Sequence, residues 1–352
     1  TFTPVKSVSA LWAIAPRETA EAIEKAHDAA VDDALRFLED EALYSRAGHA
    51  GVRQIDVRGL IAASFTHRDS RAGDPNLHTH VAIANKVQGM DGKWRSIDGR
   101  LIYQARVAVS ETYNTQMEAH LREALGVEFA EREPETLERR TVREIIGIPP
   151  ELVGLWSSRR ALIESRQAEL ATEFQTRHHR PPTPAEAIRL AQQATLETRE
   201  AKHLPRSHAE QRTTWRAQAE RAIGTDGIDR VLASSLGRAT LSRGDITEDQ
   251  LDRVAGEVVD RVARARASWQ VWHLRGEASR RARDLSGTTT QAELLTMQLL
   301  DRALATSVPL TSTGDGIEEP PQLRRSDGSS MYEVAESRLY TSQAVLDAER
   351  RI

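Results

Sequence analysis

Cysteine is absent from the 352-residue sequence, and aromatic residues make up only 5% of it. The absence of cysteine excludes a disulfide framework and any metal site built on thiolates, and it is typical of a reducing compartment. No apolar run approaches the roughly 20 residues that a membrane-spanning helix needs. The first residues also lack the layout of a secretory signal. We therefore expect a cytoplasmic protein without a membrane segment.

The composition, with 39% hydrophobic and 28% charged residues, is that of a globular protein long enough for two or three domains. The net charge of −4 does not indicate nucleic-acid binding. The middle of the chain is more basic, because residues 139–216 carry 14 Lys and Arg against 9 Asp and Glu. Arg suits phosphate contact, although a solvated Arg-rich helix face explains these charges equally well.

The spacing of apolar residues predicts helices and short strands. Apolar side chains recur every three or four positions over residues 19–43, which predicts one long helix with an acidic outer face. Long helical patterns return from residue 103 to about 283, and residues 307–328 read as a linker rich in Pro, Gly, Ser and Thr. Strands are expected over residues 54–57, 60–67, 78–85 and 94–97. The pattern predicts an α+β fold with a central antiparallel sheet flanked by helices, followed by a mainly α-helical extension.

Three histidines lie within fourteen residues. His78 and His80 are two positions apart on a predicted strand, so their side chains point to the same face. His67 ends the preceding strand, and a turn near residues 73–75 would pair the two strands and bring its imidazole beside the other two. We predict a metal site with three nitrogen ligands.

Such a site suits a divalent ion such as Zn²⁺, Mn²⁺, Mg²⁺ or Ni²⁺ and leaves positions open for substrate oxygens. A bound ion of this kind can polarise a phosphoryl oxygen. The alternative is that the three are surface histidines without a ligand. A metallo-hydrolase of the His-x-His-x-Asp-His type is excluded because Ala82 stands where its acid would be, and a cupin is excluded because no Glu lies near Ala84.

Two segments resemble the MobF-type conjugative relaxases, within the HUH endonucleases. The first is Thr1-Phe-Thr-Pro-Val-Lys-Ser-Val-Ser9, and the second is His67-x-x-Ser-Arg-x-x-Asp-Pro-x-Leu-His-Thr-His80, with Asn85 following. The resemblance covers residues 1 to about 125. It implies the relaxase palm, in which the sheet carries the metal and helices lie alongside.

By this resemblance, His67, His78 and His80 would coordinate a divalent ion that binds the scissile phosphate. Asp32, which follows an Ala-Val pair on the long helix, would orient one ligand imidazole. A solvated acidic helix face explains Asp32 equally well.

The resemblance also implies binding of single-stranded DNA at a transfer origin. Arg68 and Arg71, beside the histidines, are expected to contact phosphates, and so is Lys6. The alternatives are surface charge on a hairpin for the two arginines and a simple strand exit for Lys6.

The nucleophile of such relaxases is a Tyr upstream of the segment with which this sequence begins. We expect the sequence to be part of a longer protein, because it starts at Thr1, and we expect this segment alone to be inactive, because transesterification needs that hydroxyl. The tyrosines that are present are not assigned this role: Tyr44, Tyr103, Tyr113, Tyr332 and Tyr340.

Downstream, Trp269, Trp272, His273 and the phrase Leu339-Tyr-Thr-Ser342 resemble the junction with a helicase module, although both Trp side chains are expected in the core. No phosphate-cradling Gly-x-x-x-x-Gly-Lys-Ser/Thr motif occurs.

We expect a relaxase metal-binding core over residues 1–130, a basic helical extension over 131–218, a helical region leading toward a helicase-like module over 219–306, and a linker with the start of the next domain over 307–352.

The sequence therefore predicts the relaxase segment of a conjugative plasmid-transfer protein, which nicks and rejoins one strand of DNA in a metal-dependent reaction. Relaxosome proteins and secretion-system coupling proteins are the expected protein partners. A rolling-circle replication initiator is one alternative. A noncatalytic DNA-binding or protein-interaction scaffold with a structural metal is the other.

Overall fold

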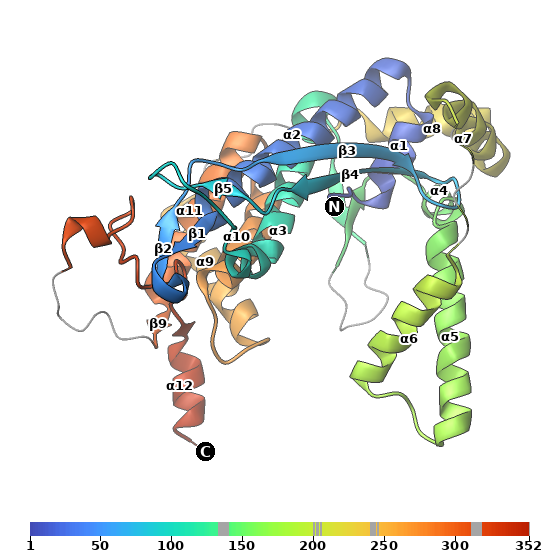
Figure 1. Ribbon diagram of the computed structural model, residues 1–352. Coiled ribbons are helices and arrows are strands. Elements are labelled where there is room, and N and C mark those ends of the chain that lie inside the picture. The colour runs from blue at the N-terminus through green and yellow to red at the C-terminus, as the bar shows by residue number, and fades with distance from the viewer. Residues whose placement is uncertain are drawn as a thin grey trace.

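The computed structural model describes residues 1–132, 141–199, 201, 204, 206–239, 244, 246–310 and 319–351 (Figure 1). Helices and short antiparallel strands confirm the predicted α+β fold. The helices are α1 (Lys6–Ile14), α2 (Arg17–Ala42), α3 (Gly99–Leu125), α4 (Pro150–Leu155), α5 (Ser158–His178), α6 (Pro184–Glu197), α7 (His208–Ile223), α8 (Thr225–Ser235), α9 (Glu248–Ala263), α10 (Val271–Leu285), α11 (Thr289–Thr306) and α12 (Gln343–Glu349).

The strands form small antiparallel sheets of two strands each. The longest pair joins β3 to β4, and Phe2 adds a short bridge on the other edge of β4, where Phe2 and Thr79 exchange two backbone hydrogen bonds of 2.9 Å. The strands are β1 (Tyr44–Ala47), β2 (Arg53–Asp56), β3 (Ala62–Asp69), β4 (Pro75–Ile83), β5 (Val87–Gln88), β6 (Trp94–Arg95), β7 (Phe129–Glu131), β8 (Arg143–Ile145), β9 (Val308–Pro309) and β10 (Tyr340–Thr341).

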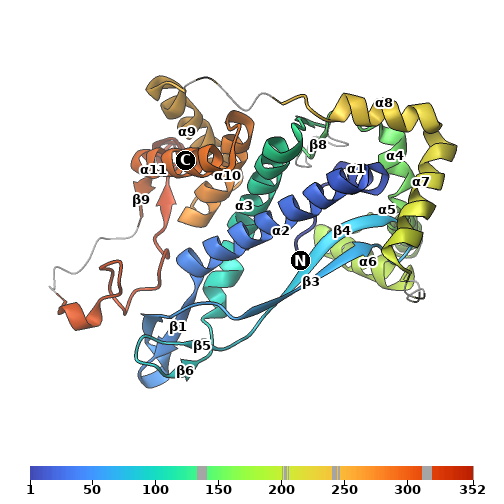
Figure 2. The same ribbon diagram turned by 90° about the horizontal axis from the view of Figure 1, so that it is seen from above.

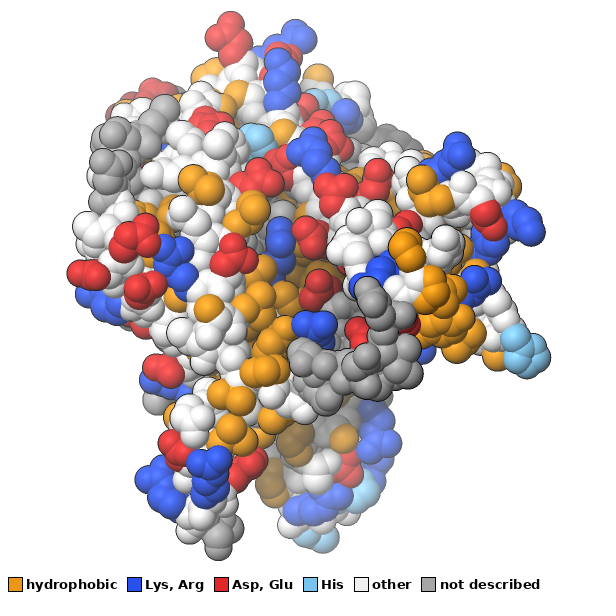
Figure 3. All heavy atoms as spheres, turned by 90° about the vertical axis from the view of Figure 1, so that its left-hand side faces the viewer, with side chains coloured by type: hydrophobic (Ala, Val, Ile, Leu, Met, Phe, Trp, Pro, Cys, Tyr) orange, Lys and Arg blue, Asp and Glu red, His pale blue; other side chains and the backbone are white. Residues whose placement is uncertain are grey.

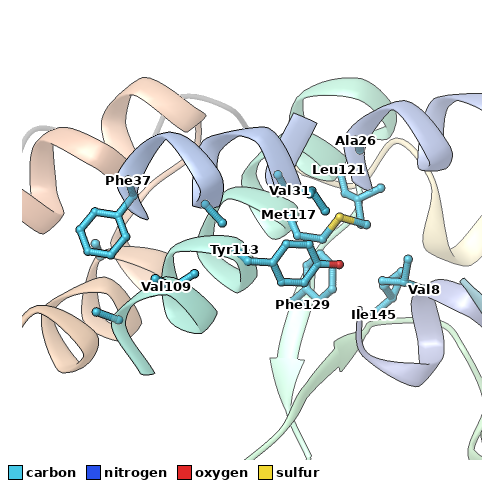
Figure 4. Packing of buried hydrophobic residues seen from close by; sticks show 14 of the residues in the cluster. Val8, Ala26, Val31, Phe37, Val109, Tyr113, Met117, Leu121, Phe129 and Ile145 are labelled. Atoms are coloured by element: carbon cyan, nitrogen blue, oxygen red, sulfur yellow. The ribbon is translucent and has the colours of Figure 1, made fainter. Parts of the chain in front are cut away.

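The two long helices α2 and α3 pack along each other and form the centre of the core. The apolar stripe predicted on α2 is buried, including Ile23, Val31 and Ala34. Figure 4 shows Val31 of α2 close to Tyr113 and Met117 of α3. Helix α10 packs against α3 as well. Buried residues from all four predicted segments belong to one continuous core, while the domain boundaries themselves stay a prediction.

The β3–β4 hairpin lies alongside α2, and its turn reaches α7 (Figure 2). Strand β4 alternates in burial: Leu77 and Thr79 are buried, whereas His80 and Ala82 are exposed. The alternation follows from the two-residue period of a strand that packs one face on the core. Helices α5 and α6 form a hairpin that projects from the body of the molecule (Figure 1).

The described parts of residues 307–328, which the sequence predicts to be a linker, contact the rest of the chain. Strand β9 pairs with β10. Arg325 is only 5% exposed and donates to Gln54 Oε1 of β2 at 3.3 Å and to the Glu333 carbonyl at 2.6 Å. These contacts pack the stretch 319–333 on the β1–β2 pair. Residues 311–318 lie outside the described residues.

Both tryptophans at the predicted junction are buried, as expected for core residues, since Trp269 is 0% and Trp272 2% exposed.

The face shown in Figure 3 carries charges of both signs, and hydrophobic side chains gather along a hollow in its middle. Among the described residues, no helix has the length and apolar character required to cross a membrane.

The carboxyl end of α3 meets the end of α8 at two glycines. Gly126 ends α3 with φ +61°, and its amide donates to the Arg122 carbonyl at 2.9 Å. A Cβ on Gly126 would lie 2.9 Å from Gly237 Cα. The amide of Gly237 donates to the Leu125 carbonyl at 2.9 Å. Only glycine at residue 126 combines this left-handed conformation with so close an approach.

We predict that Gly126→Ala lowers the free energy of unfolding by about 2 kcal/mol or more, because it adds left-handed strain to overpacking. Urea unfolding followed by circular dichroism measures the change. The matched control is Gly256→Ala inside α9, where a Cβ meets nothing within 4 Å, and which should stabilise by about 0.5–1 kcal/mol. An unchanged urea midpoint for Gly126→Ala contradicts the prediction.

Candidate metal centre

The β3–β4 hairpin brings the three predicted histidines together. His67 lies directly opposite His78 in the register, and Phe65 lies opposite His80. Residues that face each other across an antiparallel pair share one side of the sheet, as do residues two apart on one strand. The centroids of the three imidazole rings are 5.2 Å apart in all three pairs. The cluster formed by His67, His78 and His80, here called the histidine trio, lies on the outer face of the hairpin.

The size of the histidine trio fits a single small cation. Three imidazoles that bind one tetrahedral ion at about 2.0–2.1 Å have ring centroids roughly 5 Å apart. Within the described part of the chain, no group of three His, Cys, Asp or Glu side chains already has its donor atoms placed as around an ion. The rings of the trio must therefore turn before their nitrogens meet on one cation. The χ2 torsion of histidine has a broad energy well, so such a rotation costs little free energy.

Hydrogen bonds at Nδ1 leave Nε2 available on two of the rings. His78 Nδ1 lies 2.7 Å from the Asn76 carbonyl, to which it can only donate. His80 Nδ1 lies 2.8 Å from Thr1 Oγ1. A partner at one ring nitrogen fixes the tautomer and directs the other nitrogen toward a metal. Burial, with the nearby His67 and His80, lowers the pKa of His78, which favours the neutral, ligating form.

A buried chain of polar groups supports β4 from behind. His27 of α2 is 0% exposed, and its two ring nitrogens lie 2.8 Å from Tyr113 Oη and from Thr79 Oγ1. Burial lowers the pKa of His27 to about 4, so the ring is neutral near pH 7. Thr79 Oγ1 also lies 3.0 Å from Thr66 Oγ1 of β3. This chain ties α2 and α3 to the residue between the two histidines of β4, and sequence reasoning missed it.

The turn of the hairpin is held by residues far away in the sequence. Asp74 is 8% exposed and accepts hydrogen bonds from the amide and the hydroxyl of Ser158, the first residue of α5, at 3.2 and 3.0 Å. Trp215 of α7 donates its Nε1–H to the Gly73 carbonyl at 2.9 Å. Ser70 Oγ accepts from the Asp74 amide at 3.3 Å. Ser70 and Asp74 of the relaxase-like motif therefore shape and anchor the turn.

Asp32 and Lys6 do not contact the histidine trio in this structure. Asp32 is exposed on α2 and has no hydrogen bond or ion pair to the histidine trio among the described residues. Lys6 is half-buried, and its ammonium donates to the Pro75 carbonyl at 2.6 Å, while burial lowers its pKa to about 8. Lys6 thus anchors the start of β4, and its role as a DNA contact stays a prediction. Arg68 is exposed and Arg71 half-buried at the hairpin turn.

The part of the chain that contains this hairpin matches a known protein family. The family model described as TrwC relaxase matches residues 1–222. The chain belongs to the TrwC relaxase family.

Curated relatives support the same assignment. The TrwC-family chain is 29% identical over 280 residues to a multifunctional conjugation protein TraI of Escherichia coli. This alignment covers 73% of this chain and 15% of the relative. A TraI protein of Escherichia coli strain K12 is 29% identical over 161 residues, 43% of this chain and 8% of the relative. The chain therefore spans a small part of the length of these proteins. The predicted resemblance to the MobF-type relaxases is confirmed.

Solved structures of the conjugative relaxase TrwC share the fold. A copper-bound TrwC in complex with oriT DNA has a TM-score of 0.52 and 25% sequence identity, over 63% of this chain and 69% of that one. A metal-free TrwC complex with oriT DNA has a TM-score of 0.51 at 25% identity, over 62% and 71% of the two chains.

We predict that Thr79→Val lowers the free energy of unfolding by about 1–3 kcal/mol, because it leaves a buried nitrogen of His27 without a partner. Thr66→Val is the matched control: Thr66 is exposed, and its loss leaves the bond between His27 and Thr79 intact. We expect the control to cost clearly less. Urea unfolding midpoints of the two variants, measured side by side, compare the two losses of stability. Equal midpoints for the two variants contradict the prediction.

Proposed function

We propose that this chain is the metal-binding relaxase segment of a conjugative transfer protein and that it acts on single-stranded DNA at a transfer origin. The observation that carries the proposal is the histidine trio, with three rings mutually 5.2 Å apart on the exposed face of one hairpin. The TrwC relaxases of similar fold are described in complex with oriT DNA, both with and without metal.

His67, His78 and His80 are the residues proposed to hold the divalent cation. When bound, such an ion polarises a phosphodiester oxygen and offsets the charge that develops during transfer. A ligand set of three imidazoles suits Zn²⁺, Mn²⁺, Ni²⁺ or a copper ion better than Mg²⁺, which prefers oxygen ligands. Asn76 and Thr1 orient two of the rings through Nδ1. Asp32 is exposed on α2 and has no hydrogen bond or ion pair to the trio among the described residues, so its proposed part in orienting a ligand imidazole stays a prediction.

The protein side chains near the trio are suited to hold the DNA strand. Arg68 is exposed on the hairpin beside His67, and its guanidinium can contact a phosphate in two places. Arg71 follows in the turn and already takes part in an interaction. The exposed aromatic Phe65 lies opposite His80 in the register and is 56% exposed. A base can stack on such a ring, which together with nearby cations is how single strands are bound.

The proposed reaction is a transesterification. A Tyr oxygen attacks the scissile phosphorus, a new O–P bond to Tyr forms, and the bond from phosphorus to the 3′-oxygen breaks, so that the 3′-hydroxyl leaves with a proton. The Tyr is expected upstream of Thr1. Tyr113 is unsuited because it is 2% exposed and bonded to His27, and burial raises its pKa. Burial also raises the pKa of Tyr44 to about 12. Relaxosome and coupling proteins stay predicted partners.

Metal content tests the histidine trio directly. After dialysis against Zn²⁺ or Mn²⁺, elemental analysis should find about one ion per chain and almost none in His78→Ala, because two imidazoles bind an ion far more weakly than three. His49→Ala, an exposed histidine outside the trio, is the matched control and should keep its ion. Equal metal in the His78→Ala variant and the unmodified chain would remove the proposed site.

Cleavage tests the activity that the metal site serves. We expect a chain that also carries the upstream Tyr segment to cleave a single-stranded oligonucleotide of its transfer origin and to become covalently attached to the 5′ side. A chelator should abolish cleavage, and His78→Ala should lower its rate by at least about 100-fold, as losses of transition-state charge stabilisation commonly do. Metal binding without any cleavage favours the noncatalytic scaffold instead.

A further inference from the structure

A pocket lined by arginines lies between α3, α9 and α10, away from the β3–β4 hairpin. It is a pocket of about 380 Å³. Its walls come from the first half of α3, the end of α9, the loop that follows α9, and α10. The side chains that the argument uses are Arg106, Arg261, Arg264, Arg266, Trp272 and Glu277. We call this site the arginine pocket.

The arginine pocket has more positive charge than its own acids can balance. Arg261, Arg264 and Arg266 are exposed and have no ion pair among the described residues, and Arg106 donates only to the Tyr103 carbonyl at 2.8 Å. Glu277 is already engaged by Arg280 at 2.7 Å. Like charges gathered in a concave site raise the local potential and attract an anion.

An adjoining pocket provides an internal comparison. It has a volume of about 530 Å³ and shares Arg261 and Arg264 with the arginine pocket. Five acidic side chains line it against six arginines, so its charge is nearly balanced: Glu131, Glu257, Asp260, Glu277 and Asp284. The uncompensated charge is therefore concentrated at the end near Arg106 and Arg266, which makes that end the one suited to phosphate.

Apolar and aromatic groups lie next to these cations. Trp272 lines the arginine pocket, and its buried Nε1–H has no hydrogen-bond acceptor among the described residues. Val107 is 40% exposed at the same wall, and Tyr103 is 66% exposed with the Arg106 guanidinium 4.0 Å above its ring. Cations beside exposed aromatic surface are the arrangement that binds successive nucleotides of a single strand.

We propose that the arginine pocket binds the phosphate backbone of single-stranded DNA as a second contact on the strand that the histidine trio engages. This inference rests on the proposed function. The spread of the four arginines over α3, α9 and the following loop suits several phosphates in a row better than one free anion. The bases then lie toward Tyr103 and Val107. No residue of the arginine pocket belongs to the β3–β4 hairpin, so the two sites can be tested separately.

The experiment measures binding of a fluorescent oligothymidine of twelve nucleotides, which has no origin sequence, between 50 and 300 mM salt. The test variant is Arg261→Gln/Arg264→Gln/Arg266→Gln in the full chain. For single strands the slope of log K against log salt is about −0.7 per phosphate contact. We expect the variant to bind about 10-fold or more weakly at low salt and to reduce the slope by roughly two. The second variant is the single substitution Arg266→Glu, which serves if the triple variant does not fold. We expect it to weaken binding several-fold.

The matched control is Arg221→Gln/Arg230→Gln/Arg253→Gln, which changes the net charge equally at exposed arginines outside the arginine pocket. This control should keep the slope of the unmodified chain. His78→Ala should lose metal yet keep most oligothymidine binding, so failure of the metal site is distinguishable from failure of the pocket. Equal slopes for the test and control variants overturn the proposal. Thymidine monophosphate is the second probe: loss of its binding with unchanged oligothymidine binding identifies a small-phosphate site and also overturns it.

Discussion

The two-residue period of β4 is the constraint on which the candidate site depends. Leu77 and Thr79 must face the core for the strand to pack on α1 and to reach His27 of α2, and His78 and His80 consequently face outward. A slip by one residue would bury two imidazoles and expose Leu77. The hydrophobic core therefore fixes the orientation of the histidines, and the bond from Thr79 to His27 at 2.8 Å adds a polar contact that only one register can make.

The histidine trio could be predicted from sequence because its geometry is local. Its members lie within fourteen residues on one hairpin, and alternation alone decides which way they point. The contacts that hold the hairpin could not be predicted in this way. Asp74 meets Ser158 across 84 positions, and Gly73 meets Trp215 across 142. Such partners depend on tertiary packing, which no spacing pattern encodes.

The surroundings of Asp32 and Lys6 could not be predicted for the same reason. Hydrophobic spacing located the helix α2, but it did not say which polar residue on the inner face meets β4. His27 does so, from inside the buried stripe, while Asp32 is exposed. The sequence around Lys6 also did not show that its ammonium lies beside the Pro75 carbonyl. The resemblance pointed to the three histidines that the hairpin brings together, but not to His27, which supports β4 from behind.

The anchoring of the hairpin turn has a mechanical consequence. Asp74 immediately precedes β4 and is bonded to the first residue of α5, a helix of 21 residues that projects from the body with α6. A helix is stiff along its axis, so a force applied to the tip of this arm is transmitted to its base. That base is attached to the strand that carries His78 and His80. The base of the α5–α6 arm is therefore tied, through the bonds between Ser158 and Asp74, to a point four residues before His78.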